Sequence, residues 1–129
     1  MGKETVICIV ILIGICTGNY ITQKYTSKSI GTMTKDLEEL RLELIKDEVT
    51  KEECEKKIKK ADEQWEEMHN KMAYYIEHDE LEKAETNLTA LKSFCETEEY
   101  TDAVSELDKT VFVLKHIEDK NEFSWQNIF

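Results

Sequence analysis

Glycine and proline are absent from residues 32–129, and this absence restricts the fold more than any other feature of the sequence. The chain has four glycines, the last of which is Gly31, and no proline. Tight β-hairpin turns rely on these residues, because glycine adopts positive φ and proline fixes φ in advance. We therefore expect an all-α fold in which long helices are joined by short polar turns.

An apolar segment occupies residues 5–21, which read TVICIVILIGICTGNYI. As a helix it spans roughly 25 Å, slightly less than the roughly 30 Å core of a bilayer. Tyr20 and Tyr25 suit the membrane interface. We expect an uncleaved transmembrane signal anchor at residues 5–21, preceded by a short cytoplasmic start at residues 1–4. A signal peptide cleaved near residues 16–18 and a buried core helix are the alternatives.

Two features of the flanking charges oppose each other on the orientation of this anchor. A short basic start before an apolar run is typical of an anchor whose N-terminus stays in the cytoplasm. Lys24, Lys28 and Lys35 follow the segment, whereas Lys3 alone precedes it, and this distribution favours the reverse orientation. We expect the first orientation, which makes the chain a single-pass protein of the cell membrane with an extracytoplasmic domain.

The acidic charge lies almost entirely after the apolar segment. The net charge is −11, and residues 1–31 contribute +2, so residues 32–129 carry −13. A surface this acidic repels phosphate backbones, and we expect no nucleic-acid partner.

Several expected core positions are Ala or Cys, which makes the core thin. The expected partners are therefore the membrane and either a protein of unknown identity or a second copy of the chain.

Apolar residues recur at alternating steps of three and four within residues 30–44, 54–76, 81–95 and 100–114. This spacing places them on one helix face and is typical of the seam of a helical bundle. We expect residues 22–129 to form an acidic antiparallel bundle of about four helices, with the membrane helix continuing into the first. The expected core residues include Trp65, Leu88, Leu91, Leu107 and Leu114.

Polar residues predict where the helices begin and end. Thr50 and Glu53 form a capping box that starts the second helix, which we expect over residues 51–77. Thr97 is expected to cap the fourth helix. The polar residues 118–121 are expected to end it and to leave an aromatic C-terminal tail.

Histidine and acidic residues cluster near the expected junction of the second and third helices. If consecutive helices alternate in direction, His78, Asp79 and Glu80 lie at the same membrane-proximal end as His116. They would then form a polar cluster that senses pH or binds a cation weakly. In the alternative, His78 or Asp79 caps the third helix and the acidic side chains match its dipole.

The C-terminal tail reads FSWQNIF from residue 123 and is the most aromatic part of the domain. Phe123, Trp125 and Phe129 are expected to fold back onto the bundle. The alternatives are contact with the lipid interface and contact with a partner.

No motif in the sequence supports catalysis or metal binding. Glu66 and His69 form one Glu-x-x-His motif, whereas a di-iron bundle needs two. The four cysteines include no CxxC pair, and free cysteine often behaves as a small buried hydrophobe. Neither a nucleophile elbow nor a phosphate-binding glycine loop occurs. We therefore expect no catalytic, cofactor-binding or metal-binding residues, no cofactor and no enzyme activity.

The chain resembles a bacterial family catalogued as domain of unknown function 4363 (DUF4363). The resemblance extends over nearly the full length, with one departure ahead of the second helix. There the family often has an aromatic residue, and this chain reads Val49-Thr50-Lys51-Glu52. The residues that carry it are Trp65, His78-Asp79-Glu80-Leu81, Leu88-x-x-Leu91, Ala103-x-x-x-Leu107, Leu114-x-His116-Ile117 and Ser124-x-x-Asn127-Ile128-Phe129.

The resemblance implies a small protein with one N-terminal membrane segment, a helical remainder and an envelope location, and it implies no activity. Members of this family occur largely in clostridia and related Bacillota. Together with the residues above, it leads us to expect a membrane-anchored extracytoplasmic helical module for protein interaction or scaffolding. The alternative is an envelope sensor or small-ligand-binding bundle that uses the end with His78 and His116. Convergent polar groups around a pocket would favour the sensor, and a filled core with an exposed aromatic patch would favour the scaffold.

Overall fold

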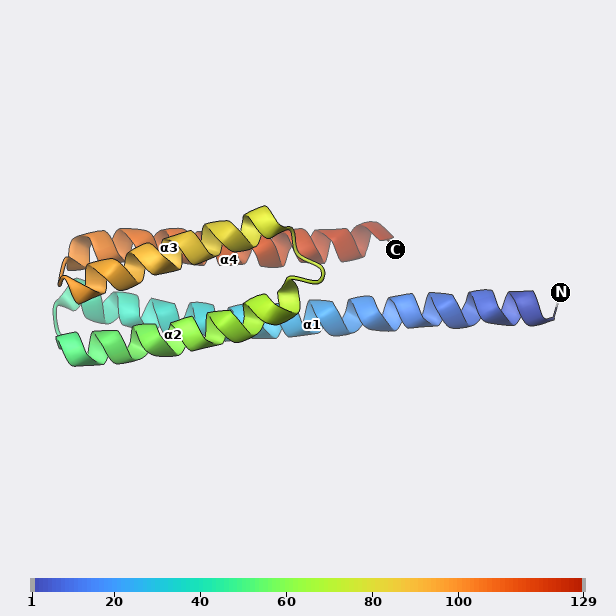
Figure 1. Ribbon diagram of the computed structural model, residues 1–129, viewed down its shortest axis with the longest axis horizontal. Helices are drawn as coiled ribbons and strands as arrows, with labels where there is room; N and C mark the ends of the chain where they lie inside the picture. Colours follow the sequence, from blue (N-terminus) through green and yellow to red (C-terminus); the bar gives the residue numbers. More distant parts are fainter. Residues whose placement is uncertain (1, 129) are drawn as a thin grey trace.

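Four α-helices account for most of the chain in the computed structural model, which describes residues 2–128 and the side chains of residues 2–122 (Figure 1). No strand occurs among these residues, so the all-α prediction is confirmed. The helices are α1 (Lys3–Lys46), α2 (Lys51–Met72), α3 (His78–Glu96) and α4 (Tyr100–Ile128).

α1 is one uninterrupted helix whose two halves have different surroundings. Its 44 residues span about 66 Å at about 1.5 Å per residue. In the first half, apolar side chains such as Val10 and Ile13 are about 60% exposed, whereas Ile30, Met33 and Leu37 in the second half are buried. The first half contains a segment that is long and apolar enough to cross a membrane, by length and composition. Figure 1 shows this half projecting beyond the other helices.

Each helix packs against two others around a shared core. α1 contacts α2 and α4, and α3 contacts the same two helices. In Figure 1 the α1–α2 and α3–α4 connections lie at one end. The α2–α3 connection lies at the other end, on the side from which α1 projects.

The apolar seams fill the space between the helices. Trp65 is 4% exposed, and Leu88, Leu91, Leu107 and Leu114 are at most 2% exposed. Their helical spacing turns one face of each helix inward, and burial of each large side chain contributes about 2 kcal/mol. The buried apolar positions extend beyond those expected from the sequence. Val49 in the α1–α2 connection and Ile117 in α4 are also buried.

Two helix ends differ from the prediction. α2 ends at Met72 instead of residue 77, because the chain turns there and the N–H groups of Tyr75 and Ile76 both donate to the Met72 carbonyl. α4 continues to Ile128 and does not end within residues 118–121. Residues 118–121 leave the helix intact, because none of them is a proline or a glycine, the two residues least favourable in a helix interior.

The caps agree with the prediction only at α2. The Thr50 hydroxyl accepts a hydrogen bond from the N–H of Glu53 at 3.2 Å, which is the N-cap half of the expected capping box. At α3 the N-cap is Glu77, and its side chain makes no capping hydrogen bond, so the capping role expected of His78 or Asp79 is wrong. Thr97 is the C-cap of α3 and not the N-cap of α4. α4 begins at Tyr100, and the carbonyl of Glu99, two residues after Thr97, accepts the first helical hydrogen bond from the N–H of Ala103.

Candidate functional site

The acidic and histidine residues near the α2–α3 connection form contacts around Glu80. Oε1 of Glu80 lies 3.8 Å from Nε2 of His116 and 4.0 Å from Nζ of Lys120. The Glu80 side chain is only 11% exposed, so the ammonium of Lys120 helps to compensate a largely buried carboxylate. His78 stands apart, because its side chain is 84% exposed and its Nε2 lies 3.9 Å from Glu82.

This cluster links α3 to α4 and has little room for a ligand. Lys120 also pairs with Glu77 at 3.1 Å, which extends the contact from α4 to the residue that precedes α3. Asp79 is exposed and lies beside a separate shallow hollow with Lys83. The adjoining cavity has a volume of about 110 Å³, whereas pockets for drug-sized ligands hold about 300–1,000 Å³. The cavity is lined by Tyr75, Ile76, Glu77, Glu80, Ile117, Lys120 and Asn121.

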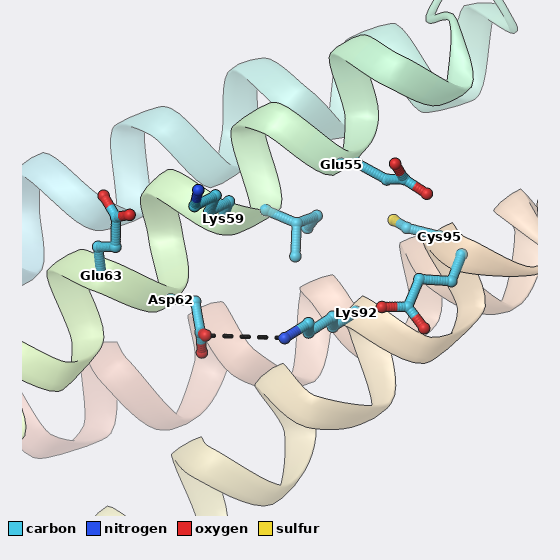
Figure 2. A pocket seen from close by; sticks show the side chains of 8 residues that line it. Glu55, Lys59, Asp62, Glu63, Lys92 and Cys95 are labelled. Carbon is cyan, nitrogen blue, oxygen red and sulfur yellow. Dashed lines mark ion pairs between the residues drawn. The ribbon is translucent and has the colours of Figure 1, made fainter.

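A groove of about 480 Å³ separates α2 from α3 near the opposite end (Figure 2). Its deepest lining residues are Ile58 and Cys95, both of which are buried. An ion pair between Asp62 and Lys92, with a separation of 3.9 Å, crosses the groove. The remaining lining side chains are charged groups of both signs at an open rim, which is not the enclosed apolar setting of a small-molecule site.

An apolar surface lies where α1 meets α4, and we call it the α1–α4 face. Leu42 and Ile45 of α1 are 56% and 55% exposed, and Phe112 of α4 is 72% exposed. A groove of about 540 Å³ runs between the two helices, with Leu107 and Val111 in its lining. Exposed apolar side chains therefore flank an apolar groove on one side of the molecule.

Ion pairs border the α1–α4 face and make it locally neutral. The guanidinium of Arg41 donates two hydrogen bonds to Asp108, at 2.6 Å from Nε and 3.3 Å from Nη2. Lys115 pairs with Glu38 at 3.3 Å. The hydrogen bond and negative charge of Asp108 raise the pKa of Arg41, so the guanidinium stays charged. The two cations and two anions cancel, in contrast to the acidic remainder of the chain.

The described residues show no arrangement suited to a metal ion: no group of three or more His, Cys, Asp or Glu side chains in them could hold one. His69, from the Glu-x-x-His motif, instead packs its ring edge against Trp65, with ring centroids 5.8 Å apart. The aromatic residues of the C-terminus were expected to fold back onto the bundle. The side chains of Phe123 and Trp125, and the whole of Phe129, lie outside what the structure describes.

A family model described as "Domain of unknown function (DUF4363)" matches residues 20–128. The chain belongs to the DUF4363 family. The match begins where the apolar segment ends and includes the whole of α2 and α3. The resemblance seen in the sequence is therefore confirmed. No curated protein and no solved structure matches the chain.

Sequence reasoning did not identify the α1–α4 face of this DUF4363 chain. The signal was present, because Leu42, Ile45 and Phe112 are apolar residues that fall off the seam positions of their helices. Single apolar residues on a helix surface are common and carry no information by themselves. Leu42 and Phe112 became informative only when the packing of α1 against α4 placed both on one groove.

Proposed function

We propose that this chain is a single-pass, membrane-anchored helical module that binds another protein through the α1–α4 face. The apolar first half of α1 is the anchor. The helical part is an antiparallel four-helix bundle on the extracytoplasmic side of the cell membrane. In this role it acts as an interaction or scaffold module and not as an enzyme.

Cross-helix ion pairs support the antiparallel arrangement. Glu43 of α1 pairs with Lys57 of α2. Seven residues earlier in α1, Asp36 pairs with Lys60, at 3.4 Å, and with Gln64, at 3.2 Å, both of which lie later in α2. Residue numbers therefore fall along one helix as they rise along the other, which is the pattern of neighbours joined by a short turn.

The observation that carries the proposal is the exposure of Leu42 and Phe112 on the two sides of one groove. Isolated exposed apolar residues need no explanation, but an apolar patch with a polar rim is typical of a protein-binding site. The neutral border of the α1–α4 face also supports binding there. The acidic remainder of the helical part repels an acidic partner, whereas this face carries no net charge and does not.

The continuity of α1 sets the height of this face above the membrane. Leu42 lies on the same helix as Ile21, the last residue of the apolar segment, with no break between them. The separation is about 30 Å at about 1.5 Å per residue. We therefore expect a partner that is itself at the membrane and presents its contact surface at that height.

Site-specific photo-crosslinking in membranes tests the proposal. A photoreactive residue replaces Phe112 in the full chain, and the matched control places it at Tyr74, which is 91% exposed but lies outside the α1–α4 face. We expect a discrete adduct from position 112 and none from position 74. Leu42→Glu should abolish this adduct without changing the helix content. Equal labelling from both positions, or an adduct that Leu42→Glu leaves intact, would contradict the proposal.

The burial of Glu80 beside His116 favours a second candidate function, an envelope sensor that responds to pH. An ordinary histidine changes charge near pH 6.5, which alters its contact with the carboxylate. In a sensor of this kind, the thermal stability of the full chain should change between about pH 5 and 7.5, and His116→Gln should remove the change. The same pH profile in both proteins would exclude His116 as the sensor.

A further inference from the structure

We propose that Cys54 and Cys95 are the two halves of a reversible disulfide that joins the start of α2 to the end of α3. This inference concerns a modification site in the core and goes beyond the proposed interaction through the α1–α4 face.

The two cysteines lie in the core at the same end of two neighbouring helices. Cys54 is the first buried residue of α2, and Cys95 is the last buried residue of α3. The two helices contact each other, and Figure 1 shows the start of α2 and the end of α3 at one end of the molecule. The influence of each thiol on the other agrees with this placement, because Cys95 lowers the pKa of Cys54, and Cys54 together with burial raises the pKa of Cys95. A disulfide between α2 and α3 would join this pair.

The other two cysteines do not compete with this pair within the folded chain. Cys8 and Cys16 lie in the exposed, apolar first half of α1. The match to the DUF4363 family begins after them, at residue 20, and includes both Cys54 and Cys95. The buried pair therefore belongs to the helical part, and the other two cysteines belong to the anchor.

Both buried cysteines lie where a helix opens most easily. Cys54 is in the first turn of α2, which begins at Lys51, and Cys95 is in the last turn of α3. Terminal turns fray at a lower free energy than the helix interior, so brief local opening exposes the sulfur atoms. Cys95 also lines the groove between the two helices, where Figure 2 shows its sulfur facing Glu55. An oxidant therefore has a route to the pair without global unfolding.

The chemistry is thiol–disulfide exchange with a small-molecule or protein disulfide as the oxidant. The Cys54 thiolate attacks one sulfur of that disulfide, forms a mixed disulfide and releases one thiol. The Cys95 thiolate then attacks the Cys54 sulfur and releases the second thiol. The protein loses two hydrogen atoms and two electrons, and the oxidant gains them as two thiols. The position of Cys54 near a helix N-terminus favours its thiolate as the first nucleophile.

Oxidation with glutathione disulfide tests the pair directly. The full chain carries Cys8→Ser and Cys16→Ser, is held in detergent micelles, and is incubated with oxidised glutathione. Mass spectrometry without reductant then searches the tryptic digest for residues 52–56 linked to residues 93–109. The matched controls add Cys54→Ala or Cys95→Ala, each of which leaves a single thiol in the helical part.

We expect the linked peptide in the two-thiol protein and in neither control. Closing the loop from residue 54 to 95 restricts the unfolded chain, so the melting temperature should rise by about 10 °C and fall again after reduction. Two results would overturn the proposal. One is that both thiols still react with an alkylating agent after oxidation and denaturation. The other is that oxidation yields only glutathione adducts or disulfide-linked dimers.

Discussion

The hydroxyl of Tyr75 donates a hydrogen bond to Oγ1 of Thr26, with an oxygen-to-oxygen distance of 2.7 Å. The direction follows from Thr26, whose own hydroxyl donates to the carbonyl of Thr22 at 2.8 Å. Thr26 is fully buried, and burial raises the pKa of Tyr75. This bond fastens the α2–α3 connection to α1 a few residues beyond the end of the apolar segment.

Tyr75→Phe removes the group that donates to the buried Thr26 oxygen and leaves only the bond from Thr26 to the Thr22 carbonyl. We expect a loss of about 1 kcal/mol in the free energy of unfolding, which is typical for one buried hydrogen bond between neutral groups. Urea unfolding of the full chain in micelles measures it. Tyr74→Phe is the matched control, because Tyr74 is 91% exposed and should cost nothing. Equal effects of the two substitutions would show that the hydrogen bond does not stabilise the fold.

Glu98→Gly should stabilise the chain. Glu98 lies in the α3–α4 connection with φ of 57°, a left-handed conformation that glycine adopts without strain. Relief of this strain contributes about 1 kcal/mol. Glu98→Ala is the control, because it removes the same charge at the end of α3 but keeps a Cβ. A gain in melting temperature for glycine alone supports the strain, and an equal gain for both would assign the effect to charge.

Gly31→Ala should also stabilise the chain, through the helix itself. Gly31 lies inside α1, and a Cβ added there meets nothing within 4 Å. Alanine is favoured over glycine in a helix interior by about 1 kcal/mol. Urea unfolding measures the gain. Gly18→Ala is the control, because Gly18 lies in the exposed apolar segment and should not affect unfolding of the helical part. A loss of stability at position 31 would mean that α1 bends there in solution.

Glu118→Gln should stabilise the chain near neutral pH. Burial and the neighbouring charges of Asp119 and Glu122 raise the pKa of Glu118 in the folded state. The folded state therefore binds a proton more readily than the unfolded state, and an ionised Glu118 lowers the stability above its folded pKa. That loss disappears as the pH falls toward the unfolded pKa of about 4.3.

The expected gain from Glu118→Gln at pH 7 is under about 1 kcal/mol, because the side chain is only partly buried. It should shrink as the pH falls through about 4 and vanish near about pH 3, where the wild-type carboxyl is protonated in both states. Urea unfolding at the two pH values tests this, with Glu85→Gln on the exposed surface of α3 as the control. A gain that persists unchanged at about pH 3 would contradict an electrostatic origin.

The sequence by itself determined the elements of this protein. The seam positions, including Leu91 and Leu107, are buried as their spacing predicted, because a period of 3.6 residues places them on one face. Thr50 starts α2 because its capping contact with Glu53 spans only three residues. Features of this kind depend on neighbours in the chain and are readable without a fold.

Only the tertiary structure decided which side chains from different helices meet. The early end of α2 depends on the turn that brings Tyr75 to Thr26, and these two residues are 49 positions apart. The α1–α4 face needs Leu42 and Phe112 on the same groove, and the proposed disulfide needs Cys54 and Cys95 at the same end of neighbouring helices. The helical period identifies the apolar face of each helix, but it does not say which partner that face meets or at what register. Packing of whole helices decides both, so these contacts could not be predicted from the sequence.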